Sequence, residues 1–485
     1  MNLVTPRHAC ENHSVATSDR LTGLDSSFLH LERDNAHMHV AGCAIFDGEP
    51  PPYDQLVSAI EERLHLVPRY RQRLAFVPLG QGRPVWVDDP HFNIGFHVRH
   101  TALPRPGGDT ELKRLAGRVF SQALDRGRPL WELWLVEGLS DGRFALLSKT
   151  HHALVDGVSG VDIATVLFDA SAEPMPPAPP EHEWQPKPLP SRAQLLGEAL
   201  VERATVPAEF ARGVRAVLRG PRGVARRAAE AAAAIGAFGA AGLSPAPPSR
   251  FNVRIGPHRR FTWVRGELAQ FKAVKNALGG TVNDVVLAAV AGALGSYLRD
   301  HGELTDGVQL RAMVPVSVRA DLEQGALGNR VAAMWAPLPV GIEDPSERLQ
   351  AISASMAGIK ESGQAVGAQA LTQLSGFAPP TIMAQAARLQ ARQRLFNLVV
   401  TNVPGPQFPL YVLGRELEAL LPMVPLAENT TLGIAIMSYN GQLNFGLTAD
   451  RDALADVEFL ADELRGAIAA LVQAADAGRP VGVAR

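Results

Sequence analysis

The sequence predicts an α/β protein made of two mixed blocks joined by a helical linker. Three observations support this class. Strand-like apolar runs alternate with amphipathic helical segments in both halves of the chain. A stretch with eight prolines between Pro174 and Pro190 separates the two halves. The chain has 485 residues and is 46% hydrophobic, which is enough for a large buried core.

The bulk composition excludes several classes of protein. The formal net charge is -2, from 47 Lys+Arg against 49 Asp+Glu, so nucleic acid is not an expected partner. Cys10 and Cys43 cannot form a disulfide framework, which favours a reducing, intracellular location. Residues 1–20 are polar and mixed and predict a flexible N-terminus without a secretory signal. No apolar run reaches the roughly 18 to 20 residues of a spanning helix, so any membrane contact is expected from one side.

The first block covers residues 21–172. Its elements, in order, are a helix with Leu56, Ile60, Leu64 and Val67 at helical spacing that breaks at Pro68, a helix over 110–124 capped by Thr110, and strands over 131–139 and 144–152. Asp141-Gly142, between the two strands, is typical of a hairpin turn. We expect the second strand to end at the histidine pair.

The linker covers residues 173–250. Its proline-rich start predicts an extended chain. Residues 192–227 hold eight arginines and three glutamates, a local charge of +5, and predict helices broken near Pro207 and Pro221. This stretch is either a solvated connector or a surface for anionic lipid or CoA phosphates.

The second block covers residues 251–485. Its elements, in order, are a strand over 261–268, a helix over 281–302, strands over 310–319 and 329–340, a helix over 345–361, a strand ending at Pro404-Gly405-Pro406, a hairpin turned at Asn440-Gly441 and a final amphipathic helix over 453–475. Thr281 and Asp284 fit a capping box, which favours a structural role for Asp284. The two blocks are similar in size and class but show no sequence repeat.

The stretch "SKTHHALVDGVSG", Ser148 to Gly160, carries the main chemical signal. A metal site is disfavoured, because adjacent residues of an extended chain point to opposite faces and no metal-ligand motif accompanies them. A polar strand end without chemistry is a second interpretation, but Asp156 and Gly157 follow at fixed offsets. The favoured interpretation is a general base, since histidine with a pKa of about 6.5 can accept a proton from a hydroxyl.

The two histidines are expected to have different roles. On the predicted strand, His152 shares a face with Thr150, whereas His151 points the other way. Asp156 would cap the following helix or pair with an arginine and so fix the loop, and Gly157 leaves space where two substrates meet. No G-x-S-x-G motif or evident nucleophile lies beside the pair. This favours direct transfer over a covalent acyl-enzyme.

"HHALVDG" resembles the H-H-x-x-x-D-G signature of CoA-dependent acyltransferases related to chloramphenicol acetyltransferase and peptide-synthetase condensation domains. Four further stretches accompany it: "LTGLDSSFLHLE", "RPLWELWLVEGL", "TVNDVVLAAV" and "TNVPGP". Together, and in this order, they resemble the bacterial wax ester synthase/diacylglycerol acyltransferase family over about residues 21–471.

The resemblance implies two chloramphenicol-acetyltransferase-like domains in a pseudo-symmetric arrangement, with a tunnel at their interface. Acyl-CoA would be a co-substrate, with no permanently bound cofactor and no metal. His152 would be the base and Asp156 mainly structural. Asn283, near a helix N-terminus, either supports the oxyanion or is a structural amide. In the segment from Asn444, where related acyltransferases carry Asp-Phe-Gly-Trp-Gly, the Trp is missing, and no catalytic role is assigned.

The expected activity is acyl-CoA:diacylglycerol O-acyltransferase, which makes triacylglycerol, with long-chain alcohols as an alternative acceptor that gives wax esters. The enzyme is expected to be cytoplasmic and peripheral to the inner membrane or lipid droplets. Two rivals remain open. One is a condensation-type enzyme that takes its acyl group from a carrier protein, and the other is a catalytically silent lipid-binding or droplet protein.

Overall fold

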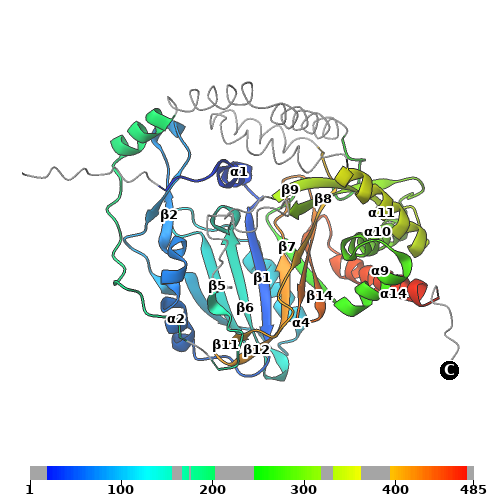
Figure 1. The fold of residues 1–485 in the computed structure, drawn as a ribbon, viewed down its shortest axis with the longest axis horizontal. Coiled ribbons are helices and arrows are strands. Elements are labelled where there is room, and N and C mark those ends of the chain that lie inside the picture. The colour runs from blue at the N-terminus through cyan, green and yellow to red at the C-terminus, as the bar shows by residue number, and fades with distance from the viewer. Residues whose placement is uncertain are drawn as a thin grey trace, which may run out of the picture.

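The computed structural model describes residues 19–155, 166–173, 176–202, 245–317, 331–361 and 394–477. These residues form two α/β lobes that lie side by side, and each lobe contains one six-stranded sheet (Figure 1). The expected α/β class with two sheet-rich domains is confirmed.

The first lobe is built on a sheet with the strand order β11-β12-β1-β6-β5-β4. Its elements up to the histidine pair are α1 (Gly23–Leu31), β1 (His39–Phe46), α2 (Tyr53–Glu61), β2 (Gln72–Ala75), β3 (Val85–Asp88), α3 (Ile94–His97), β4 (Val98–Ala102), α4 (Asp109–Phe120), β5 (Trp131–Glu137), β6 (Phe144–His151) and α5 (His152–Val155). β5 and β6 form the predicted antiparallel hairpin, and Asp141 and Gly142 both adopt positive φ in its turn.

Two details of the predicted helices were wrong. The first helix ends at Glu61 and is followed by two short 3-10 turns, Leu64–Leu66 and Pro68–Arg71, although the predicted apolar positions are all buried. Thr110 does not cap the second helix, because α4 begins one residue earlier. Gly108 occupies the cap position, and its backbone N–H donates to the Glu111 carboxylate at 3.0 Å. The acid three residues into the helix therefore fixes the start.

The second lobe is built on a sheet with the strand order β7-β14-β13-β10-β8-β9. Its elements are β7 (Arg259–Glu267), α9 (Leu268–Leu278), α10 (Val282–Asp300), β8 (Gln309–Ser317), β9 (Val331–Pro339), α11 (Pro345–Glu361), β10 (Leu398–Pro404), β13 (Leu432–Tyr439), β14 (Gln442–Asp450) and α14 (Val457–Ala477). The helices pack on one side of this sheet, with α10 in the apolar core (Figure 1). Asn440 and Gly441 turn the predicted β13–β14 hairpin, both at positive φ.

Two strands from the second half of the chain belong to the first-lobe sheet. β11 (Tyr411–Val412) and β12 (Arg415–Met423) follow the second-lobe strand β10 in sequence, yet β12 pairs antiparallel with β1 in the first-lobe sheet. Residues 411–423 therefore belong to the first-lobe sheet, although they follow residue 251, where the second block was expected to begin. β12 also lies against the second lobe, because a Cβ added at Gly446 of β14 would lie 1.7 Å from the Pro422 carbonyl oxygen.

The linker is described in part. Residues 176–190 contain no helix or strand, as expected for the proline-rich stretch, and residues 192–202 form a helix. The predicted breaks near Pro207 and Pro221 lie outside the described residues, as do residues 1–18. In the described ranges no single helix is long and apolar enough to cross a membrane. The pair α9 and α10 meets that test only jointly, and it bends by 97°.

Candidate active site

The histidine pair lies where β6 gives way to α5. β6 ends at His151, one residue before the predicted end, and His152 is the first residue of α5 and not a strand residue. The expectation that His152 shares a strand face with Thr150 was therefore wrong. The reason is local: the Ala153 N–H donates to His151 Nδ1 at 3.1 Å, which turns the chain away from the sheet.

His151 is buried, with 1% of its surface exposed. Because Nδ1 accepts the Ala153 N–H, the proton of the neutral ring resides on Nε2. Nε2 lies 3.4 Å from Glu32 Oε2, at the C-terminal end of α1. Both nitrogens of His151 are therefore directed at protein groups, one at the backbone of α5 and one at a carboxylate.

Glu32 has a largely buried carboxylate, with 9% of its side chain exposed, and several cationic or polar groups surround it. Arg126 Nε donates to Oε2 at 2.9 Å, and His37 Nδ1 lies 3.9 Å from Oε1. Burial alone would raise the pKa of Glu32, but His151 and Arg126 outweigh it and lower this pKa to about 2. Glu32 therefore carries a negative charge at neutral pH.

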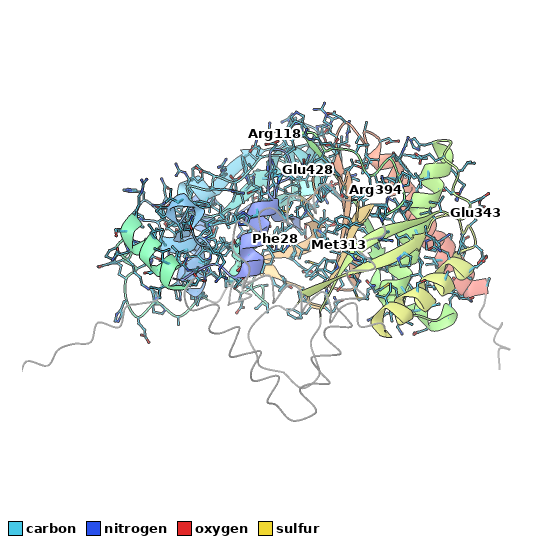
Figure 2. The ribbon with its side chains drawn as sticks, turned by 90° about the horizontal axis from the view of Figure 1, so that it is seen from above. Phe28, Arg118, Met313, Glu343, Arg394 and Glu428 are labelled. Atoms are coloured by element: carbon cyan, nitrogen blue, oxygen red, sulfur yellow. The ribbon has the colours of Figure 1, made fainter. Side chains whose placement is uncertain are left out.

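His152 is half-buried, and its ring has a different environment. It stacks on the ring of Phe28, with centroids 4.1 Å apart and an interplanar angle of 14°. Its backbone N–H donates to the Met38 carbonyl at 2.8 Å. Phe28 belongs to α1, on the side of the first lobe that faces the second (Figure 2). The two neighbouring rings are thus separated, one inside the lobe and one at its inner edge.

A second group of buried polar side chains lies behind the pair and was missed by the sequence analysis. Lys149, two residues before His151, is fully buried and lies 3.2 Å from Glu132. Burial lowers the pKa of Lys149, and Glu132 opposes this. His39 lies opposite His151 in the β1–β6 register, and its Nε2 bonds the Phe120 carbonyl at 2.9 Å. The spacing of His37 and His39, two residues apart before an apolar run, was the available signal for a shared strand face.

Asn283 lies in the second lobe, in the first turn of α10. Its Oδ1 accepts from Nδ2 of Asn402 at 3.3 Å, which brings together the stretches "TVNDVVLAAV" and "TNVPGP". The structure records no contact between Asn283 and His152 in the described ranges. The predicted capping box is confirmed, because Thr281 and Asp284 bond each other's backbone N–H groups. Ser353 also donates to Asp284, at 3.0 Å.

Asp156 and Gly157 lie outside the described residues, which resume at residue 166. Within the described part of the chain, no group of three or more His, Cys, Asp or Glu could hold a metal ion. The hollows in this part of the chain include two that the described residues line. One lies between α9, α10 and α14, and the other is lined by Arg33, Arg254 and Glu428. Neither is lined by a histidine of the pair.

The fold and the site define a class of two-lobed α/β proteins with a histidine pair at a strand end. The starter condensation domain of rhizomide synthetase, solved with C8-CoA and Leu-SNAC, has this fold. It is 16% identical to the chain with a TM-score of 0.57, and the match covers 96% of the chain and 97% of that domain.

Comparisons with closer relatives narrow this class. Residues 21–286 match the wax ester synthase/diacylglycerol acyltransferase catalytic domain, and residues 327–472 match the C-terminal domain of the same family. The probable diacylglycerol O-acyltransferase tgs1 of Mycobacterium tuberculosis is 35% identical over 458 residues, covering 94% of the chain and 96% of that protein.

A solved structure agrees with these matches. The wax ester synthase/diacylglycerol acyltransferase of Marinobacter aquaeolei VT8 is 30% identical with a TM-score of 0.66, and the match covers 94% of the chain and 100% of that structure. The chain belongs to the wax ester synthase/diacylglycerol acyltransferase family and is an O-acyltransferase.

Proposed function

We propose that the chain transfers a long-chain acyl group from acyl-CoA to the free hydroxyl of diacylglycerol, with His152 as the general base. Family membership and the names of its relatives support the reaction, and long-chain alcohols are a second acceptor class. The contrast between the two rings carries the assignment of the base. His151 is buried inside the lobe, with 1% of its surface exposed, whereas His152 is half-buried at the inner edge of the lobe.

The proposed reaction is a direct acyl transfer. A ring nitrogen of His152 takes the proton of the acceptor hydroxyl while the oxygen attacks the thioester carbonyl carbon. The tetrahedral oxyanion collapses, the C–S bond breaks, and the imidazolium returns the proton to the departing thiolate. The products are triacylglycerol and free CoA. Base catalysis of this kind contributes roughly 10²- to 10⁴-fold, and holding both substrates together adds a proximity term.

Three further residues have proposed supporting roles. Asp156 is proposed as structural support for the base, and Gly157 as a position without a side chain where the two substrates meet. Asn283 lies in the second lobe and His152 in the first. Asn283 can support the oxyanion when bound substrate places its thioester carbonyl within reach of both residues. Its bond to Asn402 favours the structural role in the absence of substrate.

The His152→Ala variant tests the base. Purified wild-type protein and variant are given labelled long-chain acyl-CoA and diacylglycerol. We expect transfer to fall by at least about 10²-fold while the melting temperature stays near that of the wild type. Near-wild-type transfer by a folded variant would refute the base assignment. Product formed only when the acyl group is supplied on a carrier protein would instead support the condensation-type rival.

The proposed location is cytoplasmic, with peripheral contact to the inner membrane or to lipid droplets. Helix 192–202 packs on the β2–β3 hairpin through Leu195, which contacts the buried side of β3. Large apolar side chains remain exposed on the hairpin tip and on this helix, namely Phe76, Leu79, Leu200 and Val201. Leu79, at the tip, is 85% exposed. The arginine-rich sequence that follows supplies positive charge suited to anionic lipid.

Flotation with vesicles that contain anionic phospholipid and diacylglycerol tests this location. We expect Leu79→Asp to reduce the bound fraction severalfold, because the side chain would no longer enter the apolar layer. Leu304→Asp is the matched control, since Leu304 is 91% exposed but lies in the second lobe. Equal binding by both variants and the wild type would refute the assignment of this surface.

A further inference from the structure

Two side chains of α1 reach the two histidines. Phe28 stacks on the ring of His152, and Glu32 receives the Nε2 side of His151. Phe28 and Glu32 are four residues apart, and the Glu32 N–H donates to the Phe28 carbonyl at 3.0 Å. Residues at this spacing lie on one side of a helix. One turn of α1 therefore contacts both members of the pair.

Glu32 is itself held in place from a third direction. Arg126 donates to its Oε2 through both Nε and Nη2, and Arg126 Nη2 also donates to the Leu29 carbonyl at 3.1 Å. The guanidinium thus fixes the carboxylate relative to the last turn of α1. Charge-assisted bonds of this kind have a defined direction as well as strength.

The contacts continue from Glu32 to the start of α5. With the carboxylate on its Nε2 side, His151 keeps a lone pair on Nδ1, and that lone pair accepts the Ala153 N–H. Ala153 directly follows His152. Loss of the Glu32 acceptor leaves the Nε2–H of a buried ring without this partner. The proton is then favoured on Nε2 by the Ala153 N–H alone, so this tautomer is held less strongly, and the turn that aims His152 loses a support.

We propose that Glu32 is a positioning residue, which acts through the tautomer of His151 to hold the ring of the His152 base. The inference rests on the proposed role of His152. A carboxylate behind one histidine and an aromatic ring against the other place the reacting imidazole from two sides. A displacement of about 1 Å at a reacting group can cost about 10²-fold in rate. The expected loss therefore appears in kcat, while KM for acyl-CoA changes little.

Two substitutions at Glu32 separate positioning from bulk stability. Glu32→Leu removes the acceptor, and we expect kcat to fall about 10- to 100-fold. Glu32→Gln keeps an acceptor oxygen and should recover most of this loss. Asp169→Leu is the matched control, because Asp169 forms a buried ion pair with Arg63 at 3.4 Å in the same lobe, beside β11. We expect it to lower the melting temperature as much as Glu32→Leu does, with kcat unchanged.

A double-substitution cycle tests whether Glu32 acts through His151. In a His151→Ala background, Glu32→Leu should lower kcat by no further factor, since the group it orients is gone. The same fold-loss in both backgrounds would overturn the proposal and leave Glu32 as a stabilising ion pair only.

Nitrogen NMR of selectively labelled histidine reports the tautomer of His151 without measuring turnover. If His151→Ala is inactive, the double-substitution cycle has no measurable kcat, and the NMR result then tests the proposal by itself. We expect the Nε2–H tautomer of His151 to dominate in the wild type and in Glu32→Gln, and to be measurably less populated in Glu32→Leu. An unchanged tautomer in Glu32→Leu would overturn the proposal. Near-wild-type activity of His152→Ala would refute the assignment of His152 as the base, but it would not change the tautomer result for His151. Failure of the proposed function and failure of the proposed role of Glu32 are therefore distinguishable.

Discussion

Glu32 carries charge in a place where charge is costly. Removing a carboxylate from water costs several kcal/mol unless cations and hydrogen bonds replace the solvent. Arg126 supplies both, and His151 contributes a further polar contact. The Arg126 side chain is 37% exposed, so the pair is partly buried, and such a pair is weak evidence for stability but has a defined geometry. Its location directly behind the histidine pair is why we assign it to positioning.

The ionised state of Glu32 predicts an acid-dependent loss of stability. Its pKa in the folded protein is about 2, below an ordinary value of 4.5, so the stabilisation is complete above the unfolded pKa and is lost as the pH falls toward 2. We expect the difference in free energy of unfolding between wild type and Glu32→Gln to shrink by on the order of 3 kcal/mol from about pH 5 to about pH 2. Urea unfolding of both proteins, at each pH at which both are folded without urea, measures this difference.

The control for this measurement is Glu61→Gln. Glu61 is an exposed carboxylate at the end of α2. Because solvent screens the interactions of an exposed side chain, Glu61→Gln should change the free energy of unfolding less than Glu32→Gln does over the same pH range. A similar pH dependence for both substitutions would contradict a specific contribution from Glu32.

At the scale of single elements, α10 shows how local sequence fixes a helix that carries a candidate site residue. Thr281 Oγ1 accepts the Asp284 N–H, and Asp284 Oδ2 accepts the Thr281 N–H at 2.8 Å. Two of the backbone donors at the helix start are therefore satisfied by side chains. This start sets the position of Asn283, one residue into the helix.

We expect Thr281→Ala to lower the free energy of unfolding by about 1 kcal/mol, because the Asp284 N–H loses its acceptor. Thr281→Ser keeps the hydroxyl and should lose much less. Urea unfolding of the three proteins measures the difference. Equal losses for Ala and Ser would mean that the threonine methyl, and not the hydroxyl, contributes the stability.

Elements with local signals were predictable from the sequence. The β5–β6 and β13–β14 hairpins have Asp-Gly and Asn-Gly turns, which favour the positive φ values observed. α10 has its capping box and Gly302. β12 shows why other elements were missed. Leu417, Ala419 and Leu421 alternate with exposed or half-buried residues, but the Glu, Leu and Ala of this stretch also suit a helix.

Non-local pairings could not be read in the same way. The sequence identified the histidine pair, but the partner of His151 depends on where α1 docks. Likewise, His39 faces His151 only because β1 and β6 pair in one particular register. Register depends on which faces are buried in the whole sheet, and a shift of one residue would reverse them. The link between Asn402 and Asn283 depends on packing between β10 and α10 for the same reason.

At the scale of the whole molecule, the two lobes are tied together by more than the linker. β12 enters the first-lobe sheet from the second half of the chain. Arg259, at the start of β7, is buried and lies 3.6 Å from Asp450 of the same lobe. Its guanidinium also donates to the Asn35 carbonyl of the first lobe. Its backbone N–H donates to Ser121 at the end of α4. These contacts predict that the lobes unfold together.

Gly446 and Gly466 form a pair that tests this coupling. At Gly446 in β14, an added Cβ would meet the Pro422 carbonyl of β12, whereas at Gly466 in α14 it would meet nothing within 4 Å. We expect Gly446→Ala to lower the free energy of unfolding by roughly 1–3 kcal/mol or more, because the backbones of β12 and β14 must separate. Gly466→Ala should raise it by up to about 1 kcal/mol, since alanine suits an exposed helix position.

Urea unfolding followed by both tryptophan fluorescence and circular dichroism should give one shared transition in each variant. If the wild type and Gly466→Ala, in which this contact is intact, instead give two separate transitions, the lobes are independent units, and contact between β12 and β14 does not couple them.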